Sequence, residues 1–145
     1  MIRKYEETDI EEILDVWYKA SSIAHPFLDS EFMEKEKKNI REVYMPNTKV
    51  WVSTNKDALD GFIAMMGNEV GAIFVRPEKH GQGIGKNLMD FVCQFHEEVE
   101  VEVFKDNKIG RAFYDKYGFK IVKEHIHEDT KHKLLRMKFN RLHNV

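Results

Sequence analysis

Three glycines at alternate positions, Gly81, Gly83 and Gly85, stand between two segments of different periodicity. The apolar run at 70–75 before them is typical of a strand, and the segment after them repeats its apolar residues at helical spacing. The first N–H groups of a helix have no partner within it, and the helix dipole favours negative charge beside them. Because glycine lets the backbone approach a ligand closely, this pattern predicts a phosphate site. The basic residues around it are Lys79, His80 and Lys86.

Two common phosphate-binding loops do not fit this stretch. A P-loop needs Ser or Thr after Gly-Lys, but Asn87 follows Lys86 here. The dinucleotide fingerprint G-x-G-x-x-G needs a further glycine at position 86 or 88, where the chain has Lys86 and Leu88. The spacing therefore indicates an anion site, and the glycines alone do not name the ligand.

The composition is that of one folded domain, and we take residues 1–145 as a single unit. The net charge of −2 argues against nucleic acid as a partner, and no apolar run approaches the ~20 residues of a membrane span. The first residues lack the apolar core of an export signal. Cys93 is the only cysteine, so no internal disulfide can form, which is typical of the reducing cytoplasm. We expect Cys93 to be a small, half-buried helix side chain and not a nucleophile.

Strand and helix patterns follow one another without a linker or repeat. The clearest strand is 99–104, where valines alternate with glutamates. Thr8 and Glu11 form a capping box for the first helix, and Asp29 or Ser30 caps the second. Strands are expected at 2–5, 50–53, 61–66, 70–75, 99–104, 119–127 and 134–139, and helices at 8–21, 29–44, 84–95 and 109–117. This order predicts an α+β or α/β three-layer domain around one mixed sheet.

A second motif follows the fifth expected strand and reads N-K-I-G-R-A-F-Y-D-K-Y-G-F, from Asn107 to Phe119. Gly118 stands where a glycine commonly ends a helix. The stretch is similar to the pattern N-x-x-A-x-x-F-Y-x-x-x-G-F of the GNAT N-acetyltransferases, with one residue more between Asn107 and Ala112. The glycine loop resembles the pyrophosphate loop of that family, [QR]-x-x-G-x-[GA], with His80 in place of Gln or Arg. The resemblance covers essentially the whole chain, and the first half is similar to a small bacterial subgroup.

The resemblance implies the GNAT fold, in which the fourth and fifth strands splay apart and the pantetheine arm of acetyl-CoA lies between them. It implies contacts of the arm with Phe74 and Val75 and a hydrogen bond with Asn107. It also implies that backbone groups of the glycine loop hold the pyrophosphate, with Lys79 or His80 meeting the outer phosphates. The loop residues so implied are Gly81, Gln82, Gly83, Gly85 and Lys86.

Acyl transfer from a thioester to an amine needs a base for the ammonium proton and a proton donor for the departing thiolate. Tyr114 occupies the family's position for the donor, and otherwise it is an aromatic residue of the core. Glu69, at the start of the fourth strand, matches a glutamate that serves as base in some members, and otherwise it is a turn residue. His25 is the other candidate base, because imidazole titrates near neutral pH. Its loop, with Pro26 and Phe27, either lines a pocket or fills the core.

Two further groups of polar residues have simpler interpretations. The charge run at 34–38 is expected to be a solvated helix face. A His-x-His pair, His125 and His127, lies near His132 and could bind zinc, but an exposed strand face is the better interpretation. No metal site is therefore expected.

The expected activity is transfer of acetyl from acetyl-CoA to a primary amine, by direct attack, in the cytoplasm. The acceptor is a protein lysine or N-terminus, an amino-acid-like metabolite, a polyamine or an aminoglycoside. The alternative is a non-catalytic acyl-CoA sensor with the same fold, which Tyr114, Asn107 and the intact loop disfavour. A nucleic-acid-binding regulator is disfavoured by the net charge. Monomer and homodimer both remain open.

Overall fold

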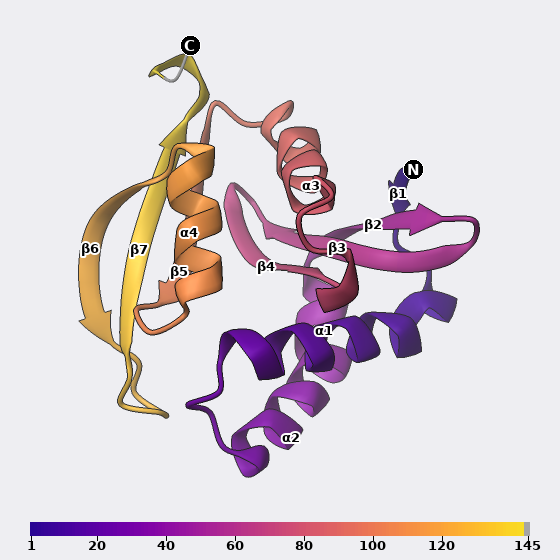
Figure 1. Cartoon of the computed structure of the whole chain (residues 1–145), viewed down its shortest axis with the longest axis horizontal. Helices are drawn as coiled ribbons and strands as arrows, with labels where there is room; N and C mark the ends of the chain where they lie inside the picture. Colours follow the sequence, from indigo (N-terminus) through magenta and orange to yellow (C-terminus); the bar gives the residue numbers. More distant parts are fainter. Residues whose placement is uncertain (144–145) are drawn as a thin grey trace.

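The computed structural model describes residues 1–143, and one seven-stranded sheet runs through it (Figure 1). The strands lie in the order β1-β2-β3-β4-β5-β7-β6. Within the described residues β4 and β5 form the one parallel pair, and all other neighbours are antiparallel. The strands are β1 (Ile2–Lys4), β2 (Lys49–Asn55), β3 (Ala58–Met66), β4 (Glu69–Val75), β5 (Glu98–Phe104), β6 (Lys120–Ile126) and β7 (Lys133–Asn140).

Within residues 1–143, four α-helices cover the two faces of this sheet: α1 (Ile10–Ala24), α2 (Ser30–Asn39), α3 (Ile84–Cys93) and α4 (Lys108–Tyr117). Successive side chains of a strand point to opposite faces, and β3 shows the division. Phe62 and Ala64 pack with α1 and α2, whereas Ile63 and Met65 pack with α3. The predicted α+β class with three layers is confirmed. Within the described part of the chain, no helix is both long and apolar enough to cross a membrane.

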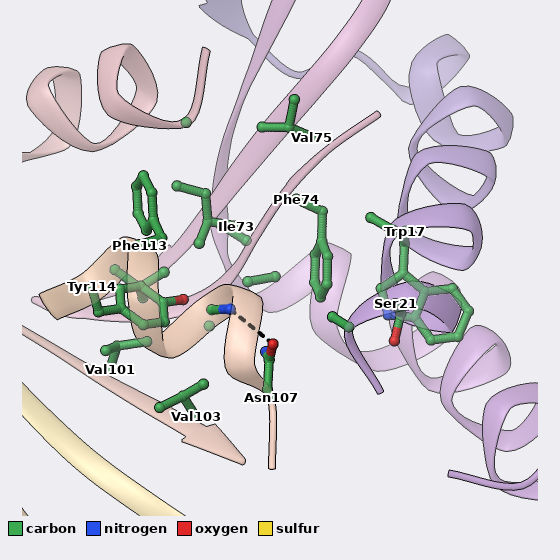
Figure 2. A pocket seen from close by; sticks show the side chains of 18 of the residues that line it. Trp17, Ser21, Ile73, Phe74, Val75, Val101, Val103, Asn107, Phe113 and Tyr114 are labelled. Atoms are coloured by element: carbon green, nitrogen blue, oxygen red, sulfur yellow. Dashed lines mark hydrogen bonds between the residues drawn. The ribbon is translucent and has the colours of Figure 1, made fainter. Parts of the chain in front are cut away.

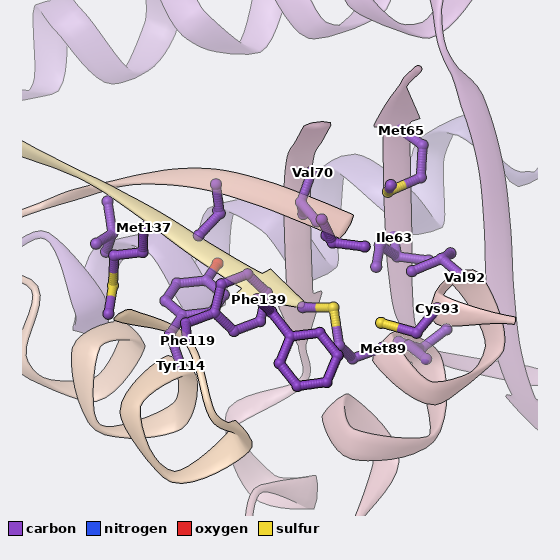
Figure 3. Packing of buried hydrophobic residues seen from close by; sticks show 14 of the residues in the cluster. Ile63, Met65, Val70, Met89, Val92, Cys93, Tyr114, Phe119, Met137 and Phe139 are labelled. Carbon is purple, nitrogen blue, oxygen red and sulfur yellow. The ribbon is translucent and has the colours of Figure 1, made fainter. Parts of the chain in front are cut away.

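The core beneath α3 and α4 joins the two halves of the sheet (Figure 3). Met89 and Val92 of α3 lie with Phe119 and Phe139, and each of the four is at most 8% exposed. Full burial of one such side chain contributes about 1.5–3 kcal/mol. Cys93 belongs to this core and is more deeply buried than the half-buried position predicted, and burial raises the pKa of its thiol.

The first helix begins differently from the prediction. A 3₁₀ turn, Glu7–Asp9, precedes α1, and Thr8 lies inside that turn. The carboxylate of Asp9 accepts a hydrogen bond from the N–H of Glu6 at 2.8 Å and two from Arg3 at 2.9 Å each. Hydrogen bonds to an ionised acceptor are stronger than those to a hydroxyl. Asp9 therefore organises this turn, and the predicted capping box based on Thr8 is wrong.

The second helix changes its hydrogen bonding part of the way along. Asp29 caps it, one of the two predicted alternatives, by accepting from the N–H of Phe32 at 2.7 Å. Beyond α2 the chain continues as a π-helical turn, Ile40–Tyr44, and then as a 3₁₀ turn, Met45–Asn47. The helix expected to run to residue 44 is thus regular over two thirds of its length. Single π turns occur frequently at functional sites, and this one borders the cleft described below.

Candidate active site

β4 and β5 separate soon after they begin to pair. They are in register at two positions, Glu69 with Glu100 and Val70 with Val101. Both strands then continue without pairing to each other. The predicted splaying of the fourth and fifth strands is confirmed.

A β-bulge at Gly71 lies at the point of separation. Val70 pairs with Met65 and Ala72 pairs with Ala64, so Gly71 is the additional residue on β4. A bulge bends its strand and increases the local twist, which turns the rest of β4 away from β5. The gap opens into a cleft of about 1270 Å³, which runs from the glycine loop to α2 (Figure 2).

The glycine loop forms one end of this cleft. A 3₁₀ turn, Pro77–Lys79, follows β4, and Gly83 is the N-cap of α3. Gly81 and Gly83 have φ of +81° and +84°, in the left-handed region where glycine is favoured. A Cβ at either position would meet no atom of the described chain within 4 Å. The loop therefore has an open space in front of its backbone.

The first turn of α3 presents N–H groups to that space. The first α-helical hydrogen bond runs from the N–H of Asn87 to the carbonyl of Gly83 at 2.9 Å, so the three intervening N–H groups precede it. No side chain caps the helix, and its first turn has no acidic residue. This arrangement and the helix dipole suit a phosphate. A Cβ on Gly85 would lie 3.1 Å from the ring of Phe113, so the glycine allows α3 to approach α4.

Two basic side chains of the loop, His80 and Lys86, already have partners within the protein. Nε2 of His80 lies 3.0 Å from the carbonyl oxygen of Val75, which turns the ring back onto the end of β4. Nζ of Lys86 pairs with Asp90 one helical turn away, at 2.8 Å. Gln82 is exposed between the two glycines of positive φ. With His80 and Lys86 engaged in this way, the open backbone N–H groups are better placed than these two side chains to meet an anion.

Asn107 begins α4 on the opposite wall. Its Oδ1 accepts a hydrogen bond from the N–H of Gly110 at 2.8 Å, drawn as a dashed line in Figure 2. A Cβ at position 110 would lie 2.5 Å from Nδ2 of Asn107, so glycine leaves room for this amide. Gly110 follows Asn107 by three residues and therefore takes the alanine position of the family pattern. The chain therefore has no additional residue in this motif, and the predicted insertion before Ala112 is wrong.

Tyr114 packs in the core and also reaches the cleft. It is 7% exposed, and its ring meets Phe113 and Phe119 edge-on, with centroids 5.4 Å apart in both pairs. Its hydroxyl oxygen points toward the middle of the cleft in Figure 2 and has no hydrogen-bond partner among residues 1–143. Burial raises the pKa of this hydroxyl. The group therefore stays protonated at neutral pH and can donate a hydrogen bond into the cleft.

Glu69 lies where the two strands separate and is part of an ion cluster. Its Oε1 is 3.3 Å from Nη1 of Arg136. The same guanidinium contacts Glu100 at 3.2 Å and Glu102 at 3.3 Å, and Nε2 of His125 is 3.1 Å from Glu102. Glu69 and Glu102 line the cleft. Three carboxylates thus share one guanidinium at this point.

His25 ends α1 and extends to the other wall. Its Nδ1 lies 2.8 Å from Oγ of Ser21, and its Nε2 lies 3.2 Å from Nδ2 of Asn107. Its ring packs edge-on against Phe27 and Phe104. Burial lowers the pKa of His25 to about 4, so the ring is neutral at pH 7. His25 therefore fits both predicted alternatives, because it lines the cleft and also packs against neighbouring aromatic rings.

Glu36 stands at the end of the cleft farthest from the glycine loop. It is half-buried, lines the cleft from α2, and has no Lys, Arg or His nitrogen within ion-pair distance in the described chain. Burial raises the pKa of Glu36, and burial together with the charge of Glu36 raises the pKa of Tyr44. Phe32 and His127 meet across this end, with ring centroids 6.1 Å apart. The solvated face predicted for 34–38 is wrong at Glu36.

His127 and His132, two of the three histidines considered above as zinc ligands, pack against aromatic rings. The centroids of His127 and His132 lie 5.4 and 6.5 Å from that of Phe104, and His132 is 4.7 Å from Phe27. The exposed strand face predicted for these residues is therefore wrong for this pair. The rings hold the turn between β6 and β7 against the loop after α1. Residues 1–143 contain no group of three or more His, Cys, Asp or Glu placed to hold a metal ion.

Three residues of the site were not predicted from the sequence. Ser21 stands four residues before His25, a spacing that places both on one helix face, so this partner could have been found. Gly110 could have been found from its place three residues after Asn107, which is the alanine position of the family pattern. Glu36 gave no signal, since nothing in a run of charges shows which one faces inward.

The sequence model of the acetyltransferase (GNAT) domain matches residues 12–140. Among curated proteins, the peptidyl-lysine N-acetyltransferase YiaC of Escherichia coli K12 is 33% identical over 123 residues, 84% of each chain. The peptidyl-lysine N-acetyltransferase YjaB of the same organism is 28% identical over 121 residues, 83% of this chain and 82% of that one.

Solved structures of acetyltransferases share the fold of this chain. The solution structure of apo-form YjaB from Escherichia coli has a TM-score of 0.87 at 25% identity and covers 96% of each chain. The PaiA N-acetyltransferase from Thermoplasma acidophilum, solved in complex with coenzyme A, shares the fold with a TM-score of 0.76 at 21% identity, over 96% of this chain and 98% of that one. The chain belongs to the GNAT family of acetyl-CoA-dependent N-acetyltransferases.

Proposed function

We propose that residues 1–145 form one N-acetyltransferase domain that acetylates lysine side chains of proteins or peptides. Its relatives YiaC and YjaB are peptidyl-lysine N-acetyltransferases. The observation that carries the proposal is the cleft, with an open anion cradle at one end, Tyr114 in its wall and, at the other end, the carboxylate of Glu36, which has no ion pair among residues 1–143. We propose that the protein acts in the cytoplasm, because a chain with a single cysteine forms no internal disulfide and needs no oxidising compartment.

The cleft has the features that acetyl-CoA requires, and acetyl-CoA supplies the activated acetyl thioester. N–H groups at residues 81–86 would hold the pyrophosphate in the open cradle. The edge of β4 that faces β5 is unpaired beyond the bulge, so the pantetheine arm can lie along this edge, beside Phe74 and Val75. The carbonyl of Val75 already contacts His80, and Phe74 pairs with Phe62 of β3. Asn107 offers an amide from the opposite wall. His80 would act indirectly, by fixing the loop to the end of β4.

Tyr114 would stabilise the departing sulfur. Because burial raises the pKa of its hydroxyl, the group keeps its proton throughout the neutral range. It can therefore donate a hydrogen bond to the sulfur as negative charge develops there. Such an interaction is stronger in the transition state than in the ground state, which is what lowers a reaction barrier.

The amine must lose a proton before it can attack, and we propose Glu69 for this step, directly or through one water molecule. Glu69 lines the cleft at the point where the strands separate. His25 is less suited to the role, because Ser21 and Asn107 occupy both of its ring nitrogens. We therefore assign His25 a different role below.

The charges at the far end of the cleft favour a cationic acceptor. Glu36 has no Lys, Arg or His within ion-pair distance in the described residues. Burial and the charge of Asp129 raise its pKa, whereas the hydrogen bond from Asn39 and the charges of His127 and Lys35 lower it, and burial has the largest effect. Uncompensated carboxylates attract and orient an ammonium group. A lysine side chain is long enough to pass Glu36 with its flexible stem and present its amine deeper in the cleft.

A thiol-release assay with three acceptors tests the proposal. The acceptors are an N-terminally blocked lysine peptide, a lysine-free peptide with a free N-terminus, and a polyamine. We expect the blocked lysine peptide to have the highest kcat/KM. Faster turnover of either other acceptor would refute the lysine assignment. CoA binding without thiol release from any of the three would favour the non-catalytic sensor.

Glu36→Gln tests the charge argument, with Glu34→Gln as the matched control. Glu34 lies on the same helix and is exposed. Loss of one partly buried charge contact should raise KM for the lysine peptide about fivefold to tenfold and leave CoA affinity unchanged. The control should behave as the parent protein. Equal KM values in both variants would remove Glu36 from acceptor recognition.

A further inference from the structure

The imidazole of His25 joins the two walls of the cleft. Ser21 lies on α1, whereas Asn107 begins α4, far along the chain (Figure 2). The two contacts of the ring measure 2.8 Å to Ser21 and 3.2 Å to Asn107. Ser21 is 2% exposed and Asn107 is 7% exposed. Polar groups buried to this degree are costly to leave unpaired, so the chain of contacts has one favoured arrangement of protons.

One backbone group sets the direction of every hydrogen bond in this chain. The N–H of Gly110 can only donate, so the atom of Asn107 that faces it at 2.8 Å is Oδ1. Nδ2 of Asn107 therefore faces His25 and donates to Nε2. The ring proton is then on Nδ1 and is donated to Oγ of Ser21, whose own proton points toward Sδ of Met33 at 3.9 Å.

This arrangement requires a neutral ring. A proton on Nε2 of His25 would face the N–H groups of Asn107, donor against donor. Burial independently lowers the pKa of His25 to about 4. The ring thus keeps the same tautomer throughout the pH range in which an acetyltransferase of a neutral compartment works.

The neutral ring fixes the Asn107 side chain from a second side. Gly110 holds Oδ1 and His25 holds Nδ2, which together set the plane of the amide. One N–H and one lone pair remain on a side chain that lines the cleft. We propose that His25 is a positioning residue, which accepts from Asn107 and so orients its amide to hydrogen-bond the pantetheine arm. This inference rests on the proposed binding of acetyl-CoA, and it differs from a role as base, which would need Nε2 to be free.

The nucleotide half of the ligand separates this role from a general effect on structure. CoA carries the pantetheine arm, whereas 3′,5′-ADP lacks it and reports only on the glycine loop. Calorimetric titration with both ligands would compare the parent with His25→Leu, which has no acceptor, and His25→Gln, whose amide oxygen lies near the place of Nε2. His25→Leu should weaken CoA about threefold to tenfold, as expected for one hydrogen bond, and leave 3′,5′-ADP unchanged. His25→Gln should restore most of the loss.

Neighbouring serines on α1 give a matched pair of controls. Ser21→Ala removes the partner of Nδ1 and should weaken CoA by about twofold. Ser22→Ala removes a hydroxyl that donates to the carbonyl of Tyr18 at 2.7 Å and should change nothing. The double variant His25→Leu with Asn107→Ala should bind CoA no more weakly than Asn107→Ala alone, because both changes act through the same amide.

Two results would overturn the inference. Equal weakening of CoA and 3′,5′-ADP by His25→Leu would show a general loss of structure, and unchanged CoA affinity would show that the arm does not depend on His25. A parent protein that binds neither ligand would overturn the proposed binding of acetyl-CoA, and this inference with it. The titrations therefore distinguish failure of the proposed acetyl-CoA binding from failure of the positioning role of His25.

Discussion

Lowering the pH should destabilise this protein through His25. The folded ring is partly buried with both nitrogens paired, and its pKa is about 4 against an ordinary value of 6.5. Between these two pH values the unfolded chain binds a proton at His25, whereas the folded chain does not. Protonation therefore favours the unfolded state. The contribution of His25 to stability is fully present above pH 6.5 and is lost as the pH falls through 4.

The size of the effect follows from the width of this interval. A difference of one bound proton changes the free energy of unfolding by about 1.4 kcal/mol per pH unit. Over the interval from pH 6.5 to pH 4 the loss is about 3 kcal/mol. An ordinary domain has only ~5–15 kcal/mol of stability in total, so the change is readily measured.

Urea unfolding of the parent and of His25→Gln provides the assay, followed by tryptophan fluorescence between about pH 7.5 and pH 4.5. Glutamine does not titrate, so the difference between the two proteins cancels the carboxylates and the other histidines. The parent should lose about 2–3 kcal/mol relative to the variant over this range. A difference that does not vary with pH would show that the folded ring titrates as it does in the unfolded chain, as a solvated ring would. The assignment of protons along Ser21, His25 and Asn107 would then fail.

Three further changes test other parts of the cleft. Tyr114→Phe should lower kcat about 10–100-fold and leave CoA affinity unchanged, and a kcat within about twofold in steady-state kinetics would make the residue part of the core alone. Gly83→Val should abolish CoA binding, because its φ of +84° strains an L side chain. His80→Ala should weaken CoA binding by only about 1–2 kcal/mol, and equal losses on titration would show that side chains hold the pyrophosphate. Gly110→Ala should lower Tm by several degrees, since its Cβ would lie 2.5 Å from Asn107, and an unchanged Tm would show that the amide can move aside.

Local patterns predicted the elements well, because they depend on neighbouring residues. The alternation in β5 puts Val99, Val101 and Val103 at no more than 5% exposure, and the glutamates between them are half-exposed. Gly118 ends α4 with φ of +121°, and its N–H donates to the carbonyl of Tyr114 at 3.1 Å. Both outcomes follow from period and cap chemistry alone.

The predictions failed where a distant or stronger partner decides the outcome. Thr8 has the right spacing for a cap, but Asp9 receives Arg3 from the neighbouring strand as well as a backbone N–H. Glu36 belongs to a run of charges, and the packing of α2 beside the cleft turns that one residue inward. His127 was placed on an open strand face, although Phe104 of another strand covers it. The surroundings of Glu36 and His127 come from distant parts of the sequence, whereas Arg3 is only six residues from Asp9 and could have been considered.

The glycines around the cleft are required for different structural reasons, and at one of them the reason concerns ligand binding. Gly83 needs its left-handed backbone, and Gly110 needs the space taken by Asn107. Gly71 has neither reason, because its φ is not in the left-handed region and a Cβ there would meet only the carbonyl oxygen of Ala64 at 3.6 Å, an ordinary contact. The fold would therefore accept a side chain at the bulge. Since Gly71 lines the cleft where the strands part, the absence of a side chain there is best explained by a ligand that comes close to the backbone.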